Sequence, residues 1–247
     1  MSLPLDHIVI AVHDLHSATP PAPTTWSCWA MSAPIDKYLQ AFAETLLMVA
    51  TSSVIAIGLG LLLAIVLTIT GPRGLYTRPR FYKGLSVTVN IFRAIPFIIL
   101  LVALLPVTRS IVGTTLGTWA AVVPLSVNLI PFYARIAQVS LNDVDPGLVE
   151  AARAMGCKRW HIVRHVLLPE ALPGIIGGMT VSVIAMVNAS AMAGAVGAGG
   201  LGDLAIRYGY ERYETRVMFE VIVILVALVS IVQFAGEFLS RRVNHRH

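Results

Sequence analysis

Five long apolar blocks constrain what this chain can fold into more than any other feature of its sequence. The first block, 45–70, contains no charged residue and exceeds the roughly 20 residues that an α-helix needs to cross the hydrocarbon core of a bilayer. The other four cover 85–107, 114–137, 174–196 and 217–239. Only 13% of the 247 residues are charged, whereas a soluble globular chain has about 25%. We therefore predict an all-α integral membrane protein with about five transmembrane helices.

Polar and kinked positions inside two of the blocks indicate helices that face the protein interior. Pro124 and Pro131 flank Asn128 in the third block, and prolines in a spanning helix free backbone carbonyls that need protein or water nearby. The fourth block is rich in small residues, which let helices approach closely, and its polar positions are Asn188 and Ser190. These three polar residues are the candidates for a solute pathway, although such residues also simply join helices together.

The distribution of basic residues predicts the orientation in the membrane. The link 71–84 and the tail 240–247 are strongly basic, and the link 138–173 also carries lysine and arginine. Lysine and arginine concentrate in cytoplasmic loops, so we expect the N-terminus outside and the C-terminus in the cytoplasm. Arg93, inside the second block, is expected to extend toward the basic side. The formal net charge of +5 thus indicates membrane lipid rather than nucleic acid as the partner.

The first 33 residues stand apart from the rest. They contain four prolines and three histidines and no sustained apolar core of a secretory signal. A lone strand at 5–12 would not be stable by itself. We expect 1–33 to be a disordered extension or to result from a start site assigned too early, with Met31 as the alternative start. The membrane domain then covers 34–247.

The link 138–173 predicts a helix–turn–helix at the membrane surface. Asp145 is a good N-cap, and Pro146 suits the first helical position. Gly156 fits the left-handed position that closes a helix, and Pro169 is expected to limit a second short helix. Apolar or small residues recur at helical spacing in the first helix: Leu148, Ala151, Ala152 and Met155.

This link also resembles a known signature. Glu150-Ala151-Ala152, three residues, Gly156, nine residues, then Val166-Leu167-Leu168-Pro169 is similar to the EAA motif of bacterial importer permeases, with valine where the family has isoleucine. The resemblance implies a type I ABC importer permease fold in which this loop forms a cytoplasmic coupling helix that docks on a separate ATPase subunit. The residues implied in ATPase coupling are Glu150, Ala151, Ala152, Met155, Gly156, Leu168 and Pro169.

Two further stretches, 92–101 and 194–210, resemble methionine importer permeases, which also have five spanning helices. The resemblance covers about 34–247. It implies a homodimer in a bacterial inner membrane, two copies of an ABC ATPase subunit, and an extracytoplasmic methionine-binding protein. The expected function is ATP-driven uptake of methionine, with D-methionine and close analogues as further candidates.

No catalytic chemistry is expected in the chain itself. It contains no phosphate-binding GxxxxGK[ST] loop, so ATP would be bound and hydrolysed by the partner, and no cofactor is expected. His161 and His165 have a spacing that can bind metal, but no third ligand or intervening glutamate supports a site.

Three other hypotheses remain at this stage. An importer permease for another small amino acid or solute would share every feature above. A secondary transporter that works alone would need an intramembrane ion or proton relay, and the polar residues of the blocks are mainly not ionisable. A membrane scaffold without transport would bind no ATPase.

Overall fold

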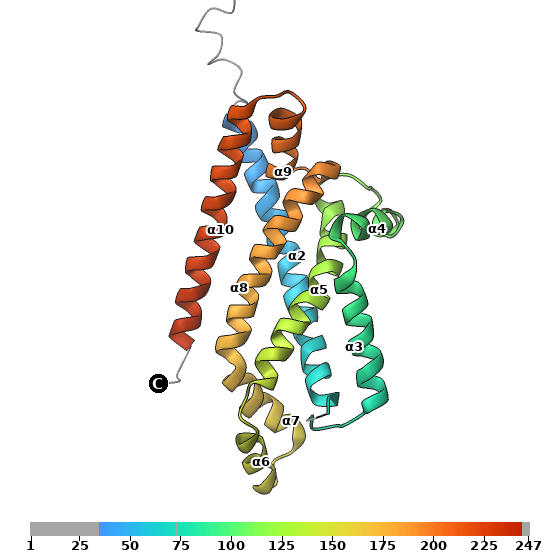
Figure 1. Ribbon diagram of the computed structural model, residues 1–247, viewed down its shortest axis with the longest axis vertical. Coiled ribbons are helices and arrows are strands. Elements are labelled where there is room, and N and C mark those ends of the chain that lie inside the picture. The colour runs from blue at the N-terminus through green and yellow to red at the C-terminus, as the bar shows by residue number, and fades with distance from the viewer. Residues whose placement is uncertain (1–34, 73, 244–247) are drawn as a thin grey trace, which may run out of the picture. The chain divides into compact units, whose positions relative to one another are not determined.

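The computed structural model describes residues 35–72 and 74–243. The expectation for 1–33 lies outside these residues. The described part of the chain is helical and contains no strand. Long helices run side by side along one axis, with the short helix α6 at one end and α9 at the other (Figure 1). We call these the α6 end and the α9 end.

Four helices are long and apolar enough to cross a membrane. They are α2 (Ile35–Thr70), α5 (Thr118–Asn142), α10 (Thr215–Val243) and a continuous helical run at 159–198 that contains α8 (Leu168–Ala193). A bent pair, α3 (Pro79–Ala94) and α4 (Phe97–Val112), makes a fifth span if it is counted as one. The prediction of about five spans is confirmed.

The second apolar block, however, is not one straight helix. The axes of α3 and α4 differ by 106°, and the chain is extended at Ile95, with ψ of 124°. Pro96 explains the break, because the residue before a proline is disfavoured in the helical region and proline donates no hydrogen bond. Polar α3 and apolar α4 therefore point in different directions.

Helix α5 packs against α2, α8, α4 and α3, and α10 packs against α8 (Figure 1). Small residues allow these close approaches. A Cβ on Gly60 would lie 2.9 Å from the ring of Tyr133, and one on Gly178 would lie 2.7 Å from a methyl group of Ile136. The side chain of Tyr133 is fully buried in this contact. The glycines of α2 and α8 thus hold both helices against α5.

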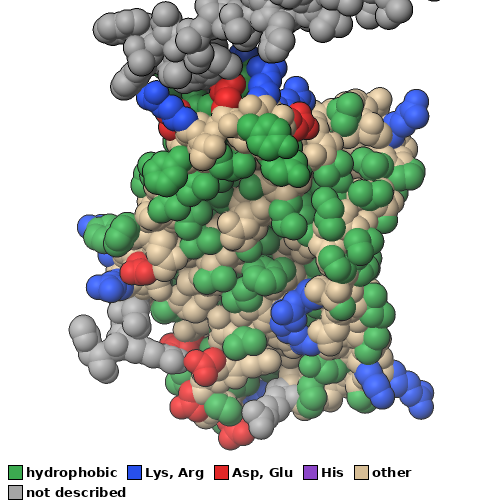
Figure 2. All heavy atoms as spheres, turned by 45° about the horizontal axis from the view of Figure 1, so that its top comes forward, with side chains coloured by type: hydrophobic (Ala, Val, Ile, Leu, Met, Phe, Trp, Pro, Cys, Tyr) green, Lys and Arg blue, Asp and Glu red, His purple; other side chains and the backbone are tan. Residues whose placement is uncertain are grey.

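Apolar side chains also cover much of the outer surface (Figure 2). Val54 on α2 and Phe234 on α10 are more than 70% exposed. A soluble monomer rarely exposes large contiguous apolar patches, whereas a bilayer removes such side chains from water. The surface therefore fits a multi-pass membrane protein.

At the α6 end, α6 (Pro146–Ala154) is followed by α7 (Arg159–Ile162) and a π-helical turn, η2 (Val163–Leu167), that continues into α8. Pro169 does not end the helix, and the sequence-based prediction that it would was wrong. The backbone N–H of Leu168 bonds to the carbonyl of Val163, five residues earlier. This wider turn is followed directly by Pro169 at the start of α8, where the N–H that proline lacks is not needed.

At the α9 end, the glycine-rich stretch 194–210 is largely helical. It forms η3 (Gly194–Ala198), α9 (Gly200–Leu204) and η4 (Ala205–Tyr210). The helical path is interrupted where η3 meets α9, at Gly197, Gly199 and Gly200, which all have φ between 78° and 87°. Glycine adopts this region at little cost.

Candidate functional site: the coupling segment and the polar ends of the bundle

Helix α6 is fixed at its start by the two residues that the sequence indicated. The side chain of Asp145 accepts a hydrogen bond from the backbone N–H of Gly147, 2.8 Å away, which satisfies one of the free donors of the first turn. Pro146 follows as the first helical residue. Val144, directly before the cap, is buried, so the entry into α6 is anchored to the body of the protein.

The end of α6 is a Schellman motif. The N–H of Cys157 bonds to the carbonyl of Ala152 at 3.1 Å, and the N–H of Gly156 bonds to that of Arg153 at 2.9 Å. Gly156 has φ of +76°. The prediction of a left-handed glycine at this position is confirmed. The motif sets the angle between α6 and α7.

The two faces of α6 have different roles. Ala152 is 3% exposed and packs into a core cluster with Ile162 and Leu167. Glu150 and Ala151 are exposed, and Met155 is 75% exposed. Ala152, although predicted for ATPase coupling, therefore holds α6 to its own chain. Glu150, Ala151 and Met155 lie on the surface.

The remaining predicted coupling residues lie in the first turn of α8. Leu168 is half-buried and Pro169 is exposed. A cavity of about 750 Å³ opens beside α6, between the link that follows α2 and the end of α5. Glu150 and Arg153 line it together with Tyr82 of α3. Helix α6 thus has one exposed side and one side that lines this cavity.

The three pathway candidates differ in how exposed they are within one chain. Asn128 is half-buried on α5, and Asn188 is exposed on α8. Ser190 is 2% exposed, and its hydroxyl donates to the carbonyl of Val187, 2.8 Å away, so it faces helix packing. Asn188 is the candidate with the most open surroundings.

Arg135 of α5 is a functional candidate that the sequence analysis missed. Its guanidinium donates to the side chains of Gln138 at 2.7 Å, Asn90 at 2.9 Å and Ser86 at 3.1 Å. The last two lie on α3, which buries only Val89 in its own chain. Arg135 therefore ties α3 to the helix that leads into α6. Arg135 lies within the predicted apolar block 114–137. A charged residue inside such a block was the one feature of the sequence that could have indicated a polar contact there.

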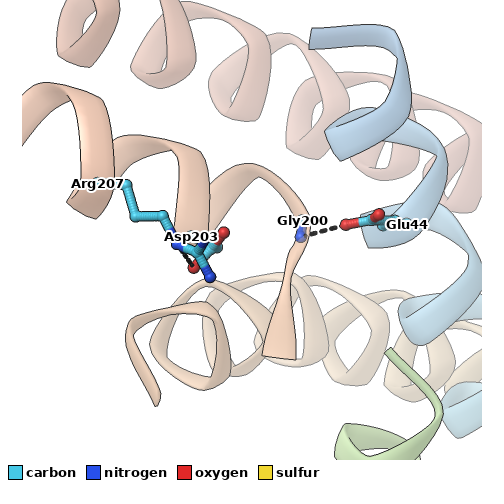
Figure 3. A network of polar contacts seen from close by, with 4 residues as sticks. All are labelled: Glu44, Gly200, Asp203 and Arg207. Atoms are coloured by element: carbon cyan, nitrogen blue, oxygen red, sulfur yellow. Dashed lines mark hydrogen bonds and ion pairs between the residues drawn. The ribbon is translucent and has the colours of Figure 1, made fainter. Parts of the chain in front are cut away.

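The α9 end contains a second missed residue, Glu44 of α2 (Figure 3). Its carboxylate accepts a hydrogen bond from the backbone N–H of Gly200 at 2.8 Å, and the hydroxyl of Thr45 accepts one from Leu201 at 2.9 Å. These side chains thereby cap the first turn of α9 from another helix. Asp203 forms an ion pair with Arg207 at 2.8 Å on the far side of α9.

Charged groups of both signs surround a cavity of about 510 Å³ at this end. Lys37 donates a hydrogen bond to the phenolic oxygen of Tyr208, and this contact holds the pKa of the phenol below its usual value. The guanidinium of Arg212 lies 4.5 Å from the centre of the same ring. The α9 end is therefore a polar, mixed-charge surface, unlike the apolar sides of the bundle.

Several apolar spans and an exposed short helix at one end define a polytopic membrane protein. The family model of binding-protein-dependent transport system inner membrane components matches residues 56–245. The chain belongs to this family, and it is thus a permease subunit of an ABC transport system.

Its relatives are similar over most of their length. The probable D-methionine transport system permease protein MetI of Vibrio cholerae is 47% identical over 211 residues, which cover 85% of this chain and 94% of the relative. The methionine import system permease protein MetP of Bacillus subtilis is 40% identical over 180 residues, or 73% and 81% of the two chains.

A solved structure has the same fold. An inward-facing conformation of the MetNI methionine ABC transporter matches with a TM-score of 0.84 and 47% identity, over 87% of this chain and 100% of the other. A bacterial ABC transporter for alginate import matches with a TM-score of 0.71 at 13% identity, a likeness of fold alone.

Proposed function

We propose that this chain is the membrane-spanning subunit of an ATP-driven importer of methionine, in its L form and also its D form. The exposed face of α6, with Glu150, Ala151 and Met155, is the observation that carries the coupling role. The names of the relatives from Vibrio cholerae and Bacillus subtilis support the substrate. The MetNI likeness supports a separate ATPase partner.

The functional complex contains two copies of this chain and two ABC ATPase subunits in a bacterial inner membrane, and an extracytoplasmic binding protein delivers methionine to it. The α6 end faces the cytoplasm, and Glu150 contacts the ATPase with Met155 in its groove. ATP bound by the ATPases moves α6. The Schellman turn at Gly156 and the buried Ala152 pass this movement to α8 and the core. The pathway lies between the two copies, with Asn128 and Asn188 as lining residues.

The test is methionine uptake into liposomes that contain this chain and its co-purified ATPase, with the binding protein outside and ATP inside. We expect accumulation that depends on ATP. Replacing methionine by other amino acids in the same assay tests the substrate. ATP hydrolysis by an intact complex without methionine accumulation would overturn the substrate but not the permease role.

The coupling role is tested separately with Met155→Asp. Met155 is 75% exposed, so the change does not disturb the core, but it places a charge where an apolar contact is expected. We expect loss of the ATPase on co-purification and loss of uptake. Tyr213→Asp is the matched control, since Tyr213 is 87% exposed at the other end of the bundle and has φ of 58°, which aspartate tolerates. Equal ATPase retention in both variants would refute the docking role of α6.

A further inference from the structure

A second cavity lies at the α6 end, where α2 leaves the membrane and α3 begins. The uncharged stretch of α2 ends at Thr70, and the link 71–84 contains four basic residues and no acidic one. This change from apolar to basic residues marks a membrane boundary. The cavity has a volume of about 470 Å³, within the range of small-molecule sites.

The walls of this cavity combine apolar and polar groups. Its lining residues are Thr70, Gly71, Pro72, Thr77, Pro79, Tyr82, Lys83, Ser86 and Val87. The prolines and Val87 form an apolar wall, and Thr77, Lys83 and Ser86 offer polar groups. Val87 is 48% exposed, and Ile91, one helical turn further along α3, is 56% exposed. An apolar track therefore leads from the cavity toward the middle of the bilayer.

The charge at the cavity is positive and is not balanced by a carboxylate. Lys83 takes part in none of the ion pairs found among residues 35–72 and 74–243. Ser86, one helical turn after Lys83, accepts a hydrogen bond from Arg135 at 3.1 Å. The other side-chain partners of Arg135, Asn90 and Gln138, are neutral. Lys83 thus lines the cavity itself, and Arg135 contacts one of its other lining residues, Ser86.

We propose that this cavity binds the headgroup of an anionic phospholipid, with an acyl chain along Val87 and Ile91. The phosphate lies at Lys83 and Ser86, at the boundary between the basic link and the apolar helix surface. Basic pockets between membrane helices on the cytoplasmic side favour such headgroups. The bound lipid fills the groove between the link and α3, a helix that has little packing of its own. The inference does not depend on which solute is transported.

The experiment is native mass spectrometry of the purified complex after removal of lipid and titration with phosphatidylglycerol or phosphatidylcholine. We expect tighter binding of phosphatidylglycerol. Lys83→Gln should weaken it about fivefold, since a basic residue near the surface contributes about that factor, and Lys83→Glu should abolish the preference. Val87→Trp, which fills the cavity without a change of charge, should also reduce binding. Arg242→Gln on α10 is the matched control, because Arg242 is an exposed basic residue away from the cavity.

Three outcomes would overturn the proposal. If Lys83→Gln and Arg242→Gln retain the same amount of phosphatidylglycerol, the cavity is not the site. If inorganic phosphate displaces the lipid at low millimolar concentration, or binds equally well without it, the site holds a free anion instead. An unchanged affinity in Val87→Trp would show that the lipid binds only by surface charge.

Discussion

At the scale of single residues, a substitution at Gly156 tests the effect of backbone conformation without a change in packing. Gly156 has φ of +76°, and a Cβ built on it meets no atom within 4 Å. Gly156→Ala therefore adds strain but no clash, at a cost of about 1–2 kcal/mol. We expect weaker closure of α6 and reduced ATP-driven uptake at normal ATPase activity. Gly58→Ala is the control, since Gly58 also has open space but lies within helical backbone. Similar uptake by the two variants would contradict a role for the turn.

Glu44 gives a second prediction at this scale. Glu44→Leu removes the acceptor for the N–H of Gly200, which is buried, and an unpaired buried donor costs about 1–3 kcal/mol. We expect a lower melting temperature of the purified complex and faster proteolysis of 194–210. Glu44→Gln retains a carbonyl oxygen that can accept this hydrogen bond. Its melting temperature should therefore be close to that of the unchanged protein. If Glu44→Gln were as unstable as Glu44→Leu, the charge rather than the hydrogen bond would matter.

At the scale of elements, α3 depends on Arg135 for its place beside α5. Arg135→Met removes two hydrogen bonds to α3 and one to Gln138, and bonds to charged groups contribute about 1.5–3 kcal/mol each. We expect amide hydrogen exchange in α3 to rise roughly tenfold or more, while that in α2 stays unchanged. Arg135→Lys should give an intermediate result. Unchanged exchange in α3 would show that packing alone holds it.

The elements also show which parts of the fold can be predicted from sequence. The spans follow from local composition, and the caps at Asp145 and Gly156 depend on neighbours within a few residues. The capping of α9 by Glu44 joins positions 156 residues apart, and no local pattern indicates it. Pro169 was misjudged because a single π-helical turn before it, η2, lets the helix continue. The pathway role of Asn128, Asn188 and Ser190 stays a prediction, and the partners of polar side chains such as Arg135 and Glu44 depend on tertiary contacts that no local pattern indicates.

At the scale of the whole molecule, the arrangement of basic segments predicts the orientation. The link after α2, the α6 segment and the last turn of α10 all lie toward the α6 end (Figure 1), and the last turn of α10 contains Arg241 and Arg242. Three basic segments on one side are what the positive-inside rule requires of a cytoplasmic face. We therefore expect the α6 end in the cytoplasm.

Cys157 makes this orientation measurable, because it is exposed directly after the α6 turn. In a Cys28→Ser chain, a membrane-impermeant maleimide should label Cys157 in inverted vesicles but not in intact spheroplasts. Tyr210→Cys with both native cysteines replaced should give the opposite result, since Tyr210 is 69% exposed at the α9 end. Labelling of Cys157 in intact spheroplasts would reverse the orientation. It would also place α6 on the side of the membrane without ATP, and the coupling role would then fail with it.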